Sequence, residues 1–175
     1  MSARRRTPER TVVLSLGSNL GPREEHILAG VSRLEGAGGL RLEALSSLYE
    51  TSPVGIATSR AFINAILIVG TALPAKDLLA VCREAERAAG RTADGPSRDR
   101  QLDVDIVFCG DEVIDERDLA IPHPRFHERL FVLVPLAEIR PAFRVPPSGK
   151  AIADYLRSCG GDAWARKVSG RSWIR

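Results

Sequence analysis

The sequence is poor in cysteine, in aromatic residues and in long hydrophobic runs, and each scarcity argues against a class of protein. Its three cysteines form no CxxC pair, so we expect neither a disulfide framework nor a structural zinc site, and a reducing compartment suits the chain. Aromatic residues make up 5% of the chain and the RNP1 pattern is absent, which argues against an RNA-binding module. The longest apolar run, residues 130–137, is too short to span a membrane.

Several signatures of catalysis and of targeting are missing as well. The chain contains no GxxxxGK[ST] phosphate loop, no GxSxG nucleophile turn and no HExxH zinc motif. The stretch GSNLG at residues 17–21 lacks the lysine of a phosphate loop and by itself predicts only a strand-to-helix turn. Near the start, the apolar run at residues 12–16 is shorter than a secretion signal needs, so we expect a cytoplasmic protein with no membrane partner.

The basic excess of the chain lies at its two ends. The formal net charge is +3, yet the first ten residues carry four arginines against one glutamate, and residues 164–175 carry four basic residues and no acidic one. The segment between them is therefore net negative, which argues against a nucleic-acid partner. From length and charge we predict one domain at residues 11–163, flanked by basic tails at 1–10 and 164–175.

Hydrophobic periodicity predicts an alternation of strands and helices. Strands are predicted at residues 11–16, 38–52, 61–73 and 102–109, helices at 23–36, 75–89 and 150–158, and a short hairpin at 110–119. The stretches 90–101 and 121–129 have no periodicity and are predicted as loops. The order β-α-β-β-α-β predicts an α+β fold of the ferredoxin-like kind, an antiparallel sheet with helices on one face and long active-site loops on the other.

Two aspartates inside the strand predicted at 102–109 are the strongest chemical signal. Side chains alternate along a strand, so Asp103 and Asp105 share one face, roughly 7 Å apart, while Leu102, Val104 and Ile106 face the helices. One interpretation is a solvated surface pair with neighbouring arginines as counter-ions. The other is a pair of hard oxygen ligands for Mg²⁺, which takes one or two carboxylates and completes its shell with water and phosphate oxygens. The two residues alone leave both interpretations open.

Two other functional classes also use this topology. A polymerase- or cyclase-like palm places carboxylates on a ferredoxin-like sheet, but it needs a further acid on a neighbouring strand, and residues 11–16 supply none. An RNA-binding module needs exposed aromatic residues on its central strands, which this sequence lacks. His123, in the proline-rich loop 121–129, fits a phosphate contact better than a metal site, since the chain has only three scattered histidines.

Five segments taken together carry a resemblance to a known family. They are LSLGSNLG, SSLYETSPVG, FINAILIV, LDVDIVFCGDEVI and IPHPRFHERLFVLVPLAEI, in this order. Over roughly residues 11–145 the chain resembles the 6-hydroxymethyl-7,8-dihydropterin pyrophosphokinases of folate biosynthesis. The resemblance implies a ferredoxin-like, Mg²⁺-dependent monomeric enzyme. It would transfer the pyrophosphoryl group of ATP to the hydroxymethyl oxygen of the pterin and release AMP.

The same resemblance implies a role for individual residues. Asp103 and Asp105 would hold two Mg²⁺ ions that bridge the triphosphate. The pterin would be bound by Thr51, Ser52, Val54, Phe62, Asn64 and Phe131. ATP would be bound by Glu86, Ile106, His123 and Arg129, with Arg91 and Arg100 gripping its phosphates.

The chain departs from the family pattern at three places. The family usually has a small residue and a proline just before the loop arginine, with an aromatic residue nearby, whereas this chain reads PSRDR at residues 96–100. Pro124 follows His123 where the family often has an aromatic residue. Asp118, next to Arg117, stands at the position matching another nucleotide-side arginine. These departures concern the loop geometry and the nucleotide side, and they leave the reaction class unchanged.

Overall fold

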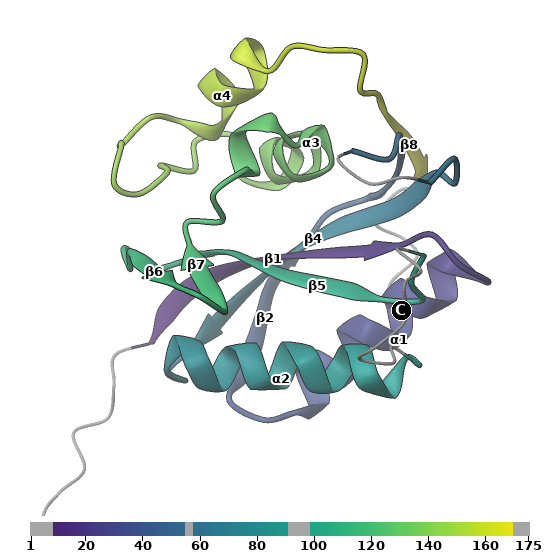
Figure 1. Cartoon of the computed structure of the whole chain (residues 1–175). Helices are drawn as coiled ribbons and strands as arrows, with labels where there is room; N and C mark the ends of the chain where they lie inside the picture. The colour runs from purple at the N-terminus through teal and green to yellow at the C-terminus, as the bar shows by residue number, and fades with distance from the viewer. Residues whose placement is uncertain (1–8, 55–57, 91–98, 170–175) are drawn as a thin grey trace, which may run out of the picture.

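The computed structural model describes residues 9–54, 58–90 and 99–169, which form a mixed sheet-and-helix fold (Figure 1). The main sheet has the strand order β5-β1-β4-β3-β8, and β2 pairs with β4 beside this path. The elements, in chain order, are β1 Arg10–Ser18, α1 Arg23–Gly36, β2 Leu40–Leu45, β3 Leu48–Thr51, β4 Phe62–Thr71, α2 Ala75–Ala88, β5 Asp103–Cys109, β6 Ile114–Glu116, β7 Leu119–Ile121, a 3-10 turn at Phe126–Glu128, α3 Leu130–Ile139, α4 Ile152–Ser158 and β8 Ala165–Ser169.

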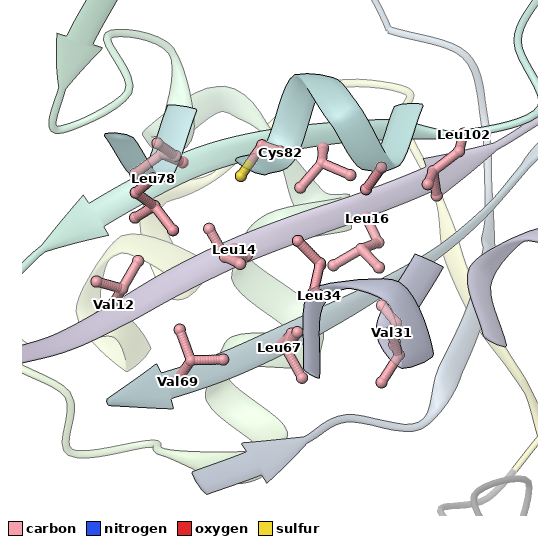
Figure 2. Packing of buried hydrophobic residues seen from close by; sticks show 14 of the residues in the cluster. Val12, Leu14, Leu16, Val31, Leu34, Leu67, Val69, Leu78, Cys82 and Leu102 are labelled. Atoms are coloured by element: carbon pink, nitrogen blue, oxygen red, sulfur yellow. The ribbon is translucent and has the colours of Figure 1, made fainter. Parts of the chain in front are cut away.

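The helices α1 and α2 cover one face of the sheet, and the hydrophobic periodicity of the sequence explains why. Alternate residues of β1 and β4 point toward these helices and are fully or almost fully buried, and Figure 2 shows how closely the two layers pack. The labelled contacts come from Val12, Leu14, Leu16, Leu67 and Val69 of the strands, Val31, Leu34, Leu78 and Cys82 of the helices, and Leu102 just before β5. Burial of this apolar area is the main stabilising contribution to the fold.

The opposite face of the sheet is divided between a second core and a polar region. The helices α3 and α4 lie over one part of this face (Figure 1), where Val13, Ile68 and Phe108 pack against Leu133 and Leu136. Further along β1 the residues facing the same way are small or polar, namely Ser15 and Gly17. Polar and small residues therefore occupy this face where α3 and α4 no longer cover it, and the candidate site lies there.

The predicted α+β class and its antiparallel, ferredoxin-like sheet are confirmed, and both long helices lie within a residue of their predicted bounds. The prediction that helices cover one face alone is wrong, because the apolar residues of α3 and α4 pack on part of the other face. The single strand predicted at 38–52 is wrong in one respect, because it is broken into β2 and β3. At the break, the backbone amide of Ser46 donates to the Ile66 carbonyl, and the Ser46 hydroxyl accepts from the Ile66 amide. The serine side chain thus replaces one bond of the strand ladder.

The C-terminal tail predicted at 164–175 also needs correction, because residues 165–169 form β8 and pair with β3. Two of the basic residues that suggested a solvated tail have acidic partners: Arg166 bonds Glu50 at 2.6 Å and Lys167 bonds Glu138 at 2.8 Å. Net charge counted along the sequence does not reveal such long-range partners. The predicted boundary at residue 163 therefore does not mark the end of the sheet.

Candidate active site

A cavity of about 220 Å³ opens on the polar part of the sheet, at the ends of β1, β4 and β5 and beside the start of α3. Most residues that the sequence assigns to the site meet here. The cavity is lined by Ser15, Gly17, Thr51, Ser52, Val54, Phe62, Asn64, Arg100, Asp103, Asp105, His123, Arg129 and Phe131. They come from four strands, the first turn of α3 and three connecting segments, so residues that are distant in the sequence are brought together by the fold.

One half of the cavity combines aromatic rings with a buried amide. Asn64 is 3% exposed, and its Nδ2 donates to the Thr51 hydroxyl at 2.8 Å across the β3–β4 pair. This bond fixes the plane of the amide and leaves its oxygen side toward Gly17. A Cβ atom at position 17 would lie 2.8 Å from Asn64 Oδ1, so only glycine leaves this amide undisturbed. Phe62 lies at the start of the same strand and adds an apolar wall.

The other half of the cavity is charged. Asp103 and Asp105 pair with Gly17 and Ser15 of β1 and share the open face of the sheet, as the strand alternation predicts. Arg100 bonds Asp103 at 2.6 Å, and Arg129 bonds Asp105 at 3.0 Å. Each carboxylate therefore has one arginine beside it. This geometry agrees in part with both interpretations of the aspartate pair. The arginines act as counter-ions, and they also line a cavity that could hold an anion.

Burial raises the pKa of Asp105 above its ordinary value, and the neighbouring Asp103 raises it further. Arg129 and Arg100 lower it, but they do not outweigh these two effects. The ionised form of Asp105 is thus disfavoured, and an added cation would stabilise it. Two carboxylates on one face are oxygen donors of the kind that Mg²⁺ prefers when water and phosphate oxygens complete its shell. Within residues 9–54, 58–90 and 99–169 no group of three or more His, Cys, Asp or Glu side chains offers a fuller set of metal ligands.

His123 contributes a neutral imidazole. Burial, with a smaller contribution from the nearby Arg129, lowers its pKa to about 4. Its Nδ1 accepts a hydrogen bond from the Arg125 backbone amide at 3.2 Å, so the ring proton is assigned to Nε2. Nε2 lies 4.0 Å from an oxygen of Asp105. The imidazole therefore presents an N–H donor toward the carboxylate end of the cavity.

A second cavity of about 270 Å³ adjoins the first and shares Asp105 and His123 with it. Its apolar wall includes Leu79 of α2 and Ile106 of β5, and its polar rim includes Arg117 and Asp118. Asp105 thus lies between two spaces of different character. The two cavities together have room for a flat ring in the first and a second group in the second, with the aspartate pair between them.

Two of the residues assigned from the sequence lie outside the first cavity, and a third is not described. Glu86 of α2 is buried on the helix side, where its carboxylate accepts the backbone amide of Val104 at 2.9 Å, so it supports the strand between the two aspartates. Ile106 belongs to the helix-side core and reaches only the second cavity. Arg91 falls outside the described residues, as does Arg98.

Ser15, Gly17 and Asn19 are site residues that the sequence reasoning missed. The alternation in residues 11–18 indicates which β1 side chains share a face. It does not indicate the register against β4 and β5 that places Gly17 opposite both Asn64 and Asp103. Register depends on pairing with distant strands, so no local signal identifies these positions.

Comparison with known proteins connects this geometry to a family. The family model described as 7,8-dihydro-6-hydroxymethylpterin-pyrophosphokinase (HPPK) matches residues 13–141. The chain is 39% identical over 126 residues to 2-amino-4-hydroxy-6-hydroxymethyldihydropteridine pyrophosphokinase of Bacillus subtilis, covering 72% of this chain and 75% of the relative. It is 36% identical over 148 residues to the protein of the same name from Pseudomonas aeruginosa, covering 85% and 91%.

Solved structures support the fold. A Plasmodium falciparum HPPK-DHPS structure superimposes with a TM-score of 0.69 at 15% sequence identity, covering 88% of this chain. The chain spans 46% of the length of that longer protein. At this identity the likeness bears on the fold alone.

Proposed function

The chain belongs to the 7,8-dihydro-6-hydroxymethylpterin-pyrophosphokinase family, and from this membership we infer its reaction. It transfers the pyrophosphoryl group of ATP to the hydroxymethyl oxygen of 6-hydroxymethyl-7,8-dihydropterin, a step of folate biosynthesis, and releases AMP. The observation that carries this assignment most directly is the position of Asp105, which lines both the ring-walled cavity and the adjoining one. A reaction between a flat heterocycle and a nucleoside triphosphate needs the phosphate charge to be neutralised where the two substrates meet.

The ring-walled half of the cavity is the pterin site in this proposal. Phe62 and Phe131 supply apolar faces for a flat heterocycle, and the Asn64 amide offers hydrogen bonds to its edge. Thr51 holds that amide in place, and Gly17 leaves room for it. Because Asn64 is buried and its bond to Thr51 uses only one amide hydrogen, a ligand without a matching polar edge would leave the remaining hydrogen-bonding capacity of the amide unused, which favours a pterin over a purely apolar ring.

The triphosphate lies across the charged half in this proposal. Arg100 and Arg129 already face the aspartates and are placed to neutralise phosphate charge, and the Nε2–H of His123 can donate to a phosphate oxygen. Asp103 and Asp105 are the residues that would hold Mg²⁺. When bound, Mg²⁺ supplies Lewis-acid polarisation of phosphate oxygens and lowers the pKa of a coordinated alcohol. The nucleotide would extend toward Leu79 and Ile106.

Positioning and charge neutralisation account for most of the catalysis of phosphoryl-type transfer. The cavity residues orient the pterin alcohol, the arginines stabilise negative charge as AMP leaves, and the buried walls reduce the water available to compete with the alcohol. In this proposal the enzyme acts as a monomer in the cytoplasm, and the free cysteines support that compartment.

Metal removal tests the magnesium part of the proposal. With ATP and the pterin alcohol both present, AMP formation should require added Mg²⁺ and stop when EDTA is in excess. Restoring Mg²⁺ should restore the rate, which controls for irreversible unfolding. Undiminished AMP formation in EDTA would contradict the role proposed for Asp103 and Asp105.

A further inference from the structure

Asp99 joins three segments of the chain that are distant in sequence. Its Oδ1 accepts a hydrogen bond from Asn19 Nδ2 at 2.7 Å and another from the Thr58 hydroxyl at 3.0 Å. Its second oxygen, Oδ2, lies 3.5 Å from Nε of Arg60. The turn after β1, the segment before β4 and the segment before β5 therefore meet at one carboxylate. Asp99 stands just before Arg100, where the family usually has proline.

Asn19 transmits this anchorage to Arg100. Its backbone amide donates to the Arg100 carbonyl at 3.1 Å, and its side-chain Oδ1 accepts the Arg100 backbone amide at 2.7 Å. Asn19 is 4% exposed, so these bonds are shielded from water. Both ends of the Asn19 amide are used, Oδ1 by Arg100 and Nδ2 by Asp99. Loss of the Asp99 acceptor would leave Nδ2 without that partner and free the amide to rotate away from Arg100.

The backbone of Arg100 in turn determines where its side chain can reach. The guanidinium bonds Asp103 at 2.6 Å and lines the cavity that we assign to the reacting groups. A proline before the arginine would restrict the backbone by fixing φ near about −65°. Asp99 has no ring to fix φ, but the hydrogen bonds that it accepts from Asn19 and Thr58 restrain the same backbone segment.

We propose that the Asp99 carboxylate is a positioning residue for Arg100, acting through Asn19 to hold the guanidinium at the reacting phosphates. This role rests on the reaction proposed above. The side chain of Asp99 is 23% exposed, and Asp99 is not among the residues that line the cavity. Its effect on the reaction is therefore indirect and depends on Arg100 being present.

A double-mutant cycle tests this dependence. Asp99→Ala should lower kcat about tenfold and leave the KM for the pterin within about twofold, because a misplaced Arg100 weakens a contact made mainly in the transition state. In an Arg100→Ala background the same change should lower kcat less than about twofold. An equal loss in both backgrounds, no loss in either, or a rise confined to the KM of the pterin would overturn the proposal.

Two further variants separate positioning from unfolding and from charge. Asp99→Asn keeps an Oδ1 acceptor for Asn19 and Thr58, so it should retain most of kcat, and a loss as large as that of Asp99→Ala would contradict the mechanism. Asp111→Ala, which removes an exposed aspartate in the turn after β5, is the matched control and should keep the full rate.

Amide hydrogen exchange reads the anchorage without any turnover. In the wild-type chain the Arg100 amide should exchange slowly, and Asp99→Ala should accelerate it at least about tenfold while Asp111→Ala does not. Unchanged exchange in Asp99→Ala would overturn the proposal even if catalysis were altered. Failure of the wild-type chain to form AMP, with exchange behaving as expected, would count against the proposed reaction and not against the anchorage.

Discussion

At the scale of single residues, the site depends on charges that are only partly compensated. The Asp105 side chain is partly buried beside Asp103, with 36% of its surface exposed, and the pKa of Asp105 stays above its ordinary value although Arg129 contacts it. Desolvation and the charge of Asp103 therefore disfavour the ionised form of Asp105 more than the two arginines favour it. The same feature distinguishes the two interpretations of the aspartate pair, because a structural ion pair and a catalytic carboxylate respond differently to neutralisation.

Asp105→Asn should separate these roles. It removes a charge whose surroundings disfavour it, so the melting temperature measured without Mg²⁺ near neutral pH should be unchanged or higher. AMP formation should fall by about 100-fold or more, because the carboxylate proposed to hold Mg²⁺ at the phosphates has been lost. Thermal unfolding and a steady-state assay on the same preparation provide both values. A markedly lower melting temperature with normal turnover would favour the structural ion pair.

Gly17→Ala should act on the pterin side alone. The added Cβ would lie 2.8 Å from Asn64 Oδ1, so the amide proposed to bind the edge of the heterocycle must move. Its hydrogen bond to Thr51 opposes this movement. We expect the KM for the pterin to rise about tenfold and the KM for ATP to change little. Gly36→Ala is the matched control, since a Cβ there meets nothing within 4 Å. Equal effects of the two substitutions on the pterin KM would refute this account of Gly17.

Local sequence pattern was sufficient for some site residues and insufficient for others. The shared face of Asp103 and Asp105 follows from alternation along one strand, so it was predictable. The roles of Gly17 and Asn19 follow from contacts with Asn64 and Arg100, which lie far away in the chain. Such contacts depend on strand register and loop path, and neither is encoded in a short window of residues.

At the scale of secondary-structure elements, β8 links a segment outside the matched family region to the pterin side of the site. The Ser52 amide donates to the Trp164 carbonyl at 3.1 Å, and the Trp164 amide donates to the Ser52 hydroxyl at 3.0 Å. Ser52 also lines the ring-walled cavity. Paired ions at Glu50 and Glu138 hold the rest of β8. The edge strand therefore helps to fix the backbone that borders the proposed pterin site.

Removing residues 164–175 tests this role of β8. The truncation should raise the KM for the pterin about tenfold and lower the melting temperature by about 5 °C, because it removes the Ser52 contacts and exposes β3 as a new edge. Removing only residues 170–175, beyond β8, is the control and should leave both values unchanged. If the longer truncation behaved like the shorter one, β8 would have no part in shaping the site.

The helices illustrate which elements a sequence predicts well. The helix α1 was predicted at its observed bounds because its apolar residues recur at helical spacing on one face. The segment 130–139, which forms α3, is apolar almost throughout, so its sequence has no helical periodicity that would predict a helix. The strand β8 was missed because its charged residues obscure a pattern that is completed only by distant acidic partners.

At the scale of the whole molecule, one face of the sheet packs the main core and the other carries the candidate site. One face is closed by α1 and α2 and supplies the main core (Figure 2). The other is covered by α3 and α4 over part of its area, which leaves the ends of β1, β4 and β5 for the site (Figure 1). Within the described part of the chain, no helix is long and apolar enough to cross a bilayer. The well-packed face thus supports an opposite face that carries the partly buried charges of the site.

The identity of the leaving nucleotide tests the central claim most directly. The enzyme is incubated with Mg²⁺, 6-hydroxymethyl-7,8-dihydropterin and ATP labelled at the β-phosphorus, and the products are separated. Pyrophosphoryl transfer predicts that AMP appears in step with consumption of the pterin and that the label moves to the pterin. Accumulation of ADP that retains the label, or AMP formed equally well without the pterin, would contradict the account.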